Sequence, residues 1–143
     1  MTNEVEIRDY QSADYPQIIE LWSQTGLGGA QRGDNQQIIE QSIAMGGRLL
    51  VAVLGNELVG TSWMTFDGRR IHLHHFGILP KYQRKGIGKN LTEKSIQFAK
   101  EKGYQVKLEV HKDNTNAIAL YTKMGFSYLG DYDVYIIRDF KNL

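Results

Sequence analysis

The stretch that decides the fold is Pro80-Lys81-Tyr82-Gln83-Arg84-Lys85-Gly86-Ile87-Gly88-Lys89-Asn90-Leu91, which lies between an apolar, strand-like run and a helical pattern. Gly86 and Gly88 open the helix, so its first N–H groups are uncovered and the positive end of its dipole points outward. The basic side chains around these glycines are Arg84, Lys85 and Lys89. No acidic residue in the stretch cancels this charge, so the N-terminus of the helix is a predicted anion-binding site, which we call the anion seat. A diphosphate fits such a site.

The spacing of the glycines excludes two other phosphate-binding loops. A nucleotide P-loop needs a glycine five positions before its Gly-Lys pair, and Gln83 stands there. A dinucleotide-binding fingerprint needs a third glycine, and Leu91 stands there. The anion seat is therefore neither a nucleotide P-loop nor a dinucleotide-binding loop, and we expect it to bind another kind of ligand.

A second segment, residues 108–126, carries a matching pattern further along the chain. It holds Asn114, then Ala117, then the pairs Leu120-Tyr121 and Gly125-Phe126. Together with the loop of residues 83–88, it resembles the two hallmark segments of the GNAT acetyltransferase superfamily, in particular its small bacterial-type members. The resemblance is close over residues 58–128 and covers the rest of the chain in outline.

Hydrophobic patterning predicts the same order of elements that this resemblance implies. The predicted strands are 5–10, 49–54, 58–66, 70–79 and 106–110, and a final hairpin is predicted around Tyr128 and 134–137. Four helices are predicted: one after Ser12, one that begins at Asp34, and two that span 86–102 and 114–124. We therefore predict a single α/β (α+β) domain over residues 1–143 with a mixed central sheet of about six to seven strands and helices on both faces. The resemblance further implies a V-shaped splay between the strands 70–79 and 106–110.

Acetyl-CoA is the co-substrate that the resemblance implies. The residues expected to hold its diphosphate and nucleotide are Gln83, Arg84, Lys85, Gly86, Ile87, Gly88 and Lys89. Gly77 and Ile78 should lie beside the pantetheine arm, where a backbone N–H polarises the thioester carbonyl. Asn114 should contact the pantetheine or the backbone near it.

Tyr121 is the expected general acid. Expulsion of a thiolate calls for a proton, and a phenol with an ordinary pKa of about 10 still carries one at neutral pH. The alternative is that Tyr121 is only a core aromatic on an amphipathic helix.

The general base is sought among the histidines of Ile71-His72-Leu73-His74-His75, because a histidine suits proton transfer near neutral pH. We favour His74, which stands where relatives of the family carry a carboxylate; His72 and a water chain to a group such as Glu109 remain alternatives. Strand alternation predicts that His72 and His74 share one face and that His75 lies on the other. We predict no metal site, because two histidines on one face lack an evident third ligand.

Composition narrows the class of protein. The formal net charge of +1 argues against nucleic-acid and membrane partners. The chain has no cysteine, so a disulfide, a Cys-based zinc site and a cysteine acyl-enzyme are all excluded. A polar N-terminus and the lack of a bilayer-length apolar run predict a cytoplasmic protein.

These observations predict an acetyl-CoA-dependent N-acetyltransferase in which a primary amine attacks directly within a ternary complex. The acceptor is left open among a protein N-terminus, a lysine and a small molecule, and a homodimer is compatible with the sequence. In the loop 26–33, Arg32 is a candidate for recognising an acidic acceptor group, although a solvated arginine is the simpler interpretation. The alternatives are an acetyl-CoA-binding sensor with little turnover and a nucleic-acid-binding domain that uses residues 81–89.

Overall fold

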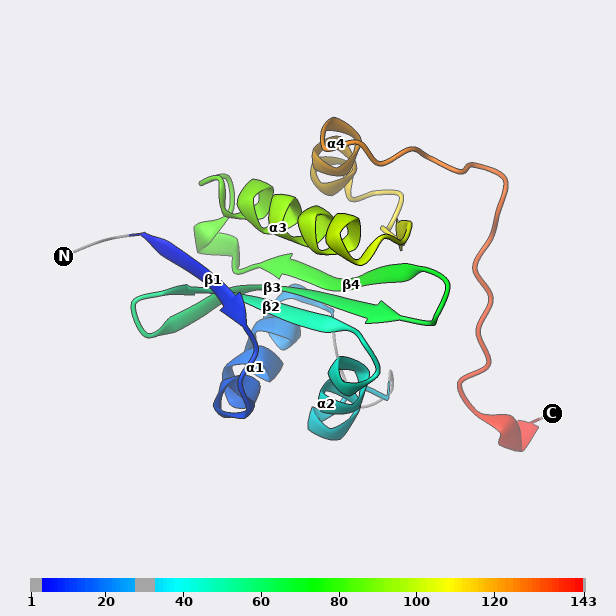
Figure 1. Ribbon diagram of the computed structural model, residues 1–143, viewed down its shortest axis with the longest axis horizontal. Coiled ribbons are helices and arrows are strands. Elements are labelled where there is room, and N and C mark those ends of the chain that lie inside the picture. Colours follow the sequence, from blue (N-terminus) through cyan, green and yellow to red (C-terminus); the bar gives the residue numbers. More distant parts are fainter. Residues whose placement is uncertain (1–3, 28–32, 143) are drawn as a thin grey trace.

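A computed structural model describes residues 4–27 and 33–142. Its five strands form one sheet in the order β1-β2-β3-β4-β5 (Figure 1). The strands are β1 (Val5–Asp9), β2 (Arg48–Leu54), β3 (Glu57–Phe66), β4 (Ile71–Ile78) and β5 (Val106–Leu108). The first four run antiparallel to their neighbours, and β4 and β5 are parallel, so the sheet is mixed as predicted.

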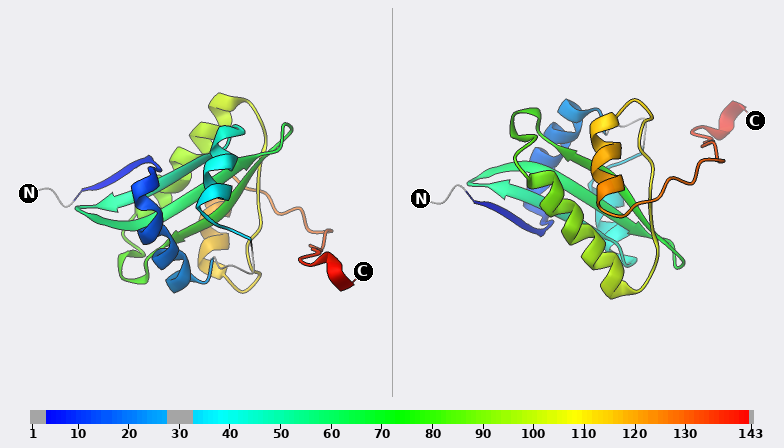
Figure 2. Two further views of the ribbon diagram at one scale, coloured as in Figure 1. Left: turned by 90° about the horizontal axis from the view of Figure 1, so that it is seen from below. Right: turned by 90° about the horizontal axis from the view of Figure 1, so that it is seen from above.

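Four helices cover the two faces of this sheet. They are α1 (Tyr15–Thr25), α2 (Gln36–Ala44), α3 (Ile87–Lys102) and α4 (Thr115–Lys123), with short 3-10 turns at Ser12–Asp14, Pro80–Tyr82 and Phe140–Asn142. Helices α1 and α2 lie on one face of the sheet, and α3 and α4 lie on the opposite side, as Figure 1 and both views of Figure 2 show. The predicted class, a mixed sheet with helices on both faces, is confirmed.

The core is built around β2 and β3, whose central side chains are almost fully buried. On the α1 face, the buried Trp22 ring stacks 5.6 Å from the ring of Trp63, and its Nε1 donates to Thr61 Oγ1 at 2.9 Å. On the α3 face, Ser62 and Ser95 are joined by a 2.7 Å hydrogen bond between their hydroxyls. Each of these four buried polar side chains thus has a partner, which avoids the cost of leaving it unsatisfied.

A bulge in β4 overturns one detail of the sequence prediction. Thr61 of β3 pairs with Gly77 and Trp63 pairs with His74, so β4 has one extra residue in this interval. His75 absorbs it with a φ of 42°, and its ring lies 5.1 Å from Trp63, which the His74 ring also contacts. The prediction that His75 lies on the opposite face from His74 is wrong, because a bulge breaks the two-residue alternation of a strand.

The two neighbouring strands β4 and β5 part soon after they meet. Ile71 to Leu73 pair with Val106 to Leu108, and β4 then continues to Ile78 while paired only with β3. Strand β5 ends at Leu108, two residues before the predicted end. The V-shaped splay that the family resemblance implied therefore begins at His74.

The predicted final hairpin does not form. Residues 127–139 contain no helix or strand and leave the body of the molecule as an extended tail (Figure 1). The described sheet accordingly has five strands rather than six or seven. A strand needs a hydrogen-bonding neighbour, and none of the five described strands pairs with the tail.

No helix in the described part of the chain is both long and apolar enough to span a bilayer.

Candidate active site

The anion seat lies at the N-terminus of α3. Gly86 is the N-cap with a φ of 85°, and Arg84 also has a positive φ of 64°. The N–H of Asn90 donates to the Gly86 carbonyl at 3.1 Å, which closes the first turn of the helix. The N–H groups of residues 87–89 come before this bond and have no acceptor within the helix. Alternating positive and negative φ angles followed by a helix N-terminus turn several N–H groups toward one point, as an anion requires.

Basic side chains surround this seat, and the loop is tied to β4. Arg84, Lys85 and Lys89 are exposed, so their charges face the solvent from which a ligand arrives. Gln83 is exposed as well, but its Nε2 donates to the Ile78 carbonyl at 2.9 Å. This bond fixes the loop relative to the end of β4.

Gly77 lies where β4 passes close to α1. A side chain there would bring its Cβ to 2.6 Å from Leu27 Cδ1, so the Leu27 side chain would have to move to admit it. Gly77 and Ile78 pair with Thr61 and Gly60 of β3, and their other side is the splayed edge of β4. Both predicted residues therefore lie beside the gap between β4 and β5.

Tyr121 reaches the same region from α4. Its ring lies 5.7 Å from Phe76 of β4 and 5.6 Å from Phe126, both in edge-on geometry. Burial raises the pKa of this phenol well above its ordinary value, so it stays protonated at neutral pH. Among the described residues, no hydrogen bond of its hydroxyl accompanies the burial that shifts its pKa.

Asn114 is the N-cap of α4. Its side-chain oxygen accepts from the Ala117 N–H at 3.3 Å, the usual role of asparagine at this position. The residue orients the helix that carries Tyr121, while a contact to pantetheine stays a prediction.

The histidines lie on the α1 side of the splay. The Nε2 of His74 is 2.9 Å from Thr65 Oγ1, and burial, with smaller contributions from His75 and His72, lowers the pKa of His74 to about 4. His72 stacks 5.9 Å from His74. Among the described residues no three His, Asp or Glu side chains come together as a metal site.

His75 forms a contact that sequence reasoning missed. Its Nε2 lies 2.8 Å from Asp34 Oδ2, and both side chains are largely buried. The ring is packed 4.4 Å from Trp22, so Trp22 lines this cluster as well as the core. The sequence predicts that a helix begins at Asp34, whereas the cap of α2 is Asn35, whose side chain accepts a hydrogen bond from the Ile38 N–H.

The candidate residue Arg32 lies outside the described residues. Trp63 faces α1, whereas Phe66 packs 4.7 Å from Tyr104 beyond the end of α3, so these two side chains of β3 lie on opposite faces of the sheet.

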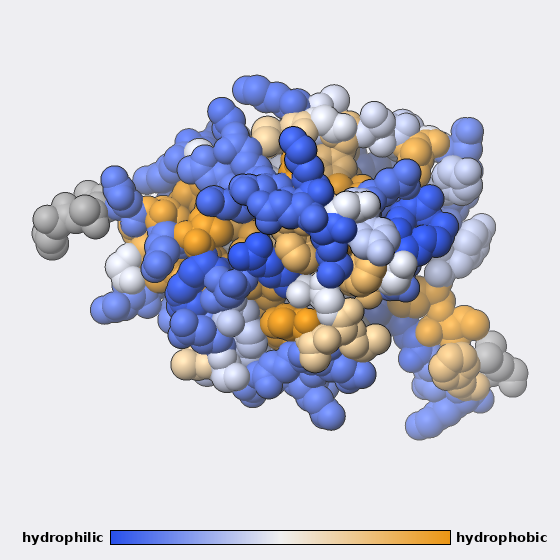
Figure 3. Space-filling model, in the orientation of Figure 1, coloured by the Kyte–Doolittle hydropathy of each residue, from blue (hydrophilic) through white to orange (hydrophobic). Residues whose placement is uncertain are grey.

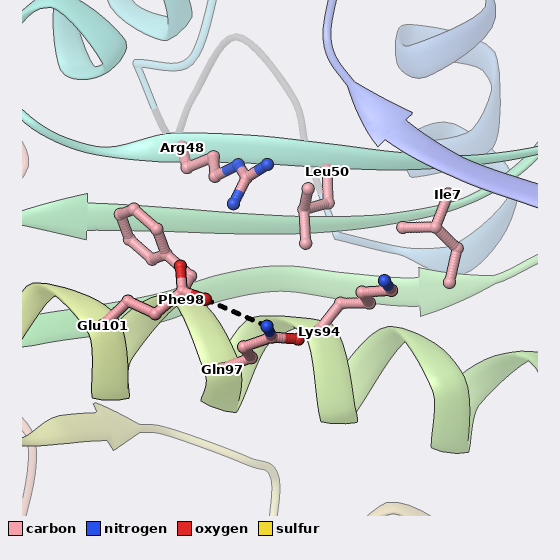
Figure 4. Close-up of a pocket in the computed structure, with 7 residues that line it drawn as sticks. All are labelled: Ile7, Arg48, Leu50, Lys94, Gln97, Phe98 and Glu101. Atoms are coloured by element: carbon pink, nitrogen blue, oxygen red, sulfur yellow. Dashed lines mark hydrogen bonds between the residues drawn. The ribbon is translucent and has the colours of Figure 1, made fainter.

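A separate hollow of about 230 Å³ lies between the β1–β2 edge and α3 (Figure 4). Its lining residues are Ile7, Arg48, Leu50, Lys94, Gln97, Phe98 and Glu101. Arg48 is already held by Asp9 at 2.6 Å, and Gln97 donates to Glu101 at 2.9 Å. Strand β3 separates β2 from β4, so this hollow is not part of the splayed site.

A mixed sheet that splays beside a helix-terminal anion seat, with a tyrosine packed against the parting strand, defines the acetyltransferase class of α/β proteins. The profile of the Acetyltransferase (GNAT) family matches residues 8–126, and the chain belongs to this family. The resemblance drawn from the sequence is thereby confirmed.

Individual relatives agree with this assignment. N-alpha-acetyltransferase RimI of Mycobacterium tuberculosis is 39% identical over 80 residues, which cover 53% of this chain and 49% of that protein, so the match spans about half the length of the relative. The ribosomal-protein-S18-alanine N-acetyltransferase of Escherichia coli has a similar structure, with a TM-score of 0.74 and 20% identity over 87% of this chain and 78% of that one. The PaiA N-acetyltransferase of Thermoplasma acidophilum, solved with coenzyme A, gives a TM-score of 0.72 and 22% identity over 87% and 90% of the two chains. At these identities the two structures show the shared fold.

Proposed function

We propose that this protein is an acetyl-CoA-dependent N-acetyltransferase that acetylates a primary amine. The observation that carries the proposal is the convergence of three features at one place. The N-terminus of α3 is joined to β4 by the loop 79–86, β4 parts from β5 at His74, and Tyr121 packs against Phe76 just beyond that point. A thioester in the gap would have its diphosphate at the seat and its sulfur toward α4.

The residues of the seat suit the diphosphate of coenzyme A. Uncovered N–H groups at residues 87–89 and the helix dipole favour phosphate oxygens, and Arg84, Lys85 and Lys89 add charge. The resemblance assigns the pantetheine to Gly77, Ile78 and Asn114, and the position of the first two on the splayed edge supports this.

The proposed reaction is a direct transfer. The amine nitrogen attacks the thioester carbonyl, a C–N bond forms, and the C–S bond breaks. Tyr121 gives its proton to the departing thiolate, and a base takes one proton from the amine. The absence of cysteine from the chain supports direct attack over an acyl-cysteine route.

For the base, the geometry supports His75 better than His74. His74 stays a prediction, but an imidazole with a pKa of about 4 accepts a proton poorly near pH 7, and its Nε2 already contacts Thr65. His75 lies one residue further toward the open end of the splay, and the carboxylate of Asp34 beside it would stabilise the imidazolium that forms.

The acceptor that we propose to test first is a peptide α-amino group. The relative with 39% identity is named an N-alpha-acetyltransferase, and this supports the choice. A lysine side chain or a small amine is the alternative acceptor. We also propose a cytoplasmic location, where acetyl-CoA and such acceptors occur together.

The decisive experiment is a thiol-release assay with acetyl-CoA and a panel of N-terminal peptides, lysine peptides and small amines, with calorimetric binding of acetyl-CoA alongside. We expect saturable binding and turnover with at least one amine. Tight binding without turnover across the panel would favour the acetyl-CoA sensor instead. Failure to bind acetyl-CoA would contradict the proposal.

A further inference from the structure

A buried hydroxyl lies directly against the bulge of β4. Hydrophilic side chains dominate the face of the molecule shown in Figure 3, whereas the polar side chain of Thr61, in the middle of β3, is fully buried. Its Oγ1 donates to the His75 carbonyl at 2.7 Å and accepts from Trp22 Nε1 at 2.9 Å. These two hydrogen bonds connect α1, through β3, to the backbone of the bulge.

The chemistry of the three groups fixes the direction of both hydrogen bonds. An indole N–H can only donate and a carbonyl can only accept. The Thr61 hydroxyl therefore receives a hydrogen bond from Trp22 and gives its single hydrogen to His75. A buried group that loses its partner cannot turn to bulk water, so removal of this hydroxyl would leave two polar groups unsatisfied.

The bulge needs a support of this kind. Thr61 pairs with Gly77 and Trp63 pairs with His74, so His75 and one further residue of β4 occupy the interval between these pairs. His75 adopts a φ of 42°, and a non-glycine residue holds a positive φ only where its surroundings enforce it. The Thr61 hydroxyl supplies a donor for the carbonyl of this strained residue.

The supported carbonyl belongs to the peptide that joins His75 to Phe76. On the α1 side of this peptide, the His75 ring contacts Asp34 at 2.8 Å. On the other side, the Phe76 ring lies 5.7 Å from Tyr121. One peptide unit thus carries both the proposed base and the ring against which the proposed acid packs.

We propose that Thr61 is a positioning residue, whose hydroxyl fixes the His75–Phe76 peptide and so sets the place of the His75 ring relative to Tyr121. Its effect on catalysis rests on the proposed function, whereas its effect on the position of the His75 ring does not. Threonine suits this role because its branched Cβ restricts χ1 and keeps the hydroxyl aimed at one acceptor.

Four variants separate the hydroxyl from packing. Thr61→Val removes the hydroxyl and keeps the branched shape, Thr61→Ala removes it without placing a methyl group against the carbonyl, and Thr61→Ser retains it. Ser62→Ala is the matched control, because Ser62 is the next residue of β3 and its buried 2.7 Å hydrogen bond to Ser95 lies on the opposite face.

Steady-state kinetics and calorimetry measure the catalytic effect. We expect Thr61→Val and Thr61→Ala to lower kcat by about tenfold or more while the affinity for acetyl-CoA stays within about twofold. Thr61→Ser and Ser62→Ala should keep kcat within about threefold of the wild type. An unchanged kcat in both variants that lack the hydroxyl would overturn the proposal.

Nuclear magnetic resonance tests the position of the ring without any turnover. The ring centroids of His75 and Trp22 are 4.4 Å apart, so nuclear Overhauser effects should join the two rings in the wild type, in Thr61→Ser and in Ser62→Ala. We expect these effects to be lost in Thr61→Val and Thr61→Ala, and undiminished effects in both would overturn the proposal.

A further signal belongs to the wild type alone and does not depend on how any variant folds. The Thr61 hydroxyl proton should exchange slowly enough to be observed and should show an Overhauser effect to the indole N–H of Trp22. Absence of this signal would also overturn the proposal. If the wild type turns over no amine, the proposed function fails, and the ring contacts still decide whether Thr61 positions His75.

Discussion

Asp34 Oδ2 lies 2.8 Å from His75 Nε2, and this contact joins the start of α2 to the bulge of β4. The two residues are far apart in the sequence and meet beside Trp22. A carboxylate that contacts one imidazole nitrogen fixes the orientation of the ring, and it stabilises the protonated form. The pair is therefore the first place to test how the amine loses its proton.

We expect His75→Gln to lower kcat/KM by a factor on the order of 10² or more and to remove the acidic limb of the pH–rate profile. Asp34→Asn keeps the shape of the side chain but removes its charge, so the limb should move to lower pH with a smaller loss of rate. His74→Gln is the matched comparison and should retain the limb. If His74→Gln abolishes the limb and His75→Gln does not, the base is His74 as the sequence predicted.

Tyr121→Phe should reduce kcat by roughly 10²- to 10⁴-fold with little change in the affinity for acetyl-CoA, because it removes a proton donor and keeps the ring. Burial raises the pKa of this phenol, so the wild-type enzyme should show no loss of activity from its ionisation at neutral or mildly alkaline pH. Steady-state kinetics and calorimetry measure the two quantities. Tyr104→Phe, on a half-exposed ring, is the control, and equal rates for Tyr121→Phe and wild type would make Tyr121 a packing residue.

Gly86→Asp should abolish binding of acetyl-CoA. The new carboxylate would occupy the anion seat, and a Cβ at this position meets no atom within 4 Å, so the fold should survive. Gly86→Asn is the matched control: it has the same size and the same strain at a φ of 85° without the charge. Calorimetric titration with acetyl-CoA compares the affinities of the two variants. Undiminished binding by Gly86→Asp would show that this loop does not bind the diphosphate.

The buried His74 should make stability depend on pH. Its pKa falls from the ordinary 6.5 to about 4 in the folded protein, mainly through burial, so below pH 6.5 the unfolded chain binds a proton that the folded chain does not. Stability should therefore be full above pH 6.5 and fall as the pH drops toward 4, by about 2 kcal/mol between pH 7 and pH 5.

Urea unfolding at pH 7 and pH 5 measures this change. His74→Gln should flatten the difference, whereas His111→Gln, at an exposed position, should leave it as in the wild type. A His74→Gln variant with an undiminished pH dependence would assign the effect to another group.

Local patterns in the sequence were enough to predict most elements. The predicted helix 86–102 matches α3 (Ile87–Lys102), because the glycines at both ends, Gly86 and Gly103, adopt the left-handed conformation that delimits a helix. Helix α4 and its cap Asn114 follow from the same kind of short-range signal. The seat at the α3 N-terminus needs only this one helix and the loop before it, so neighbouring residues predict it.

The sequence by itself thus determined the element order up to α4, the conformation of the loop for which we propose diphosphate binding, and the position of Tyr121 on α4, since each depends on contacts within a few residues along the chain. Only the tertiary structure decided the face on which His75 lies, its contact with Asp34 and the fate of the tail. A bulge depends on the pairing of one strand with another, and the pattern of apolar residues within β4 does not predict it. The tail has strand composition but pairs with no strand in the described part of the chain, because strand formation depends on a neighbouring edge that the local sequence does not provide.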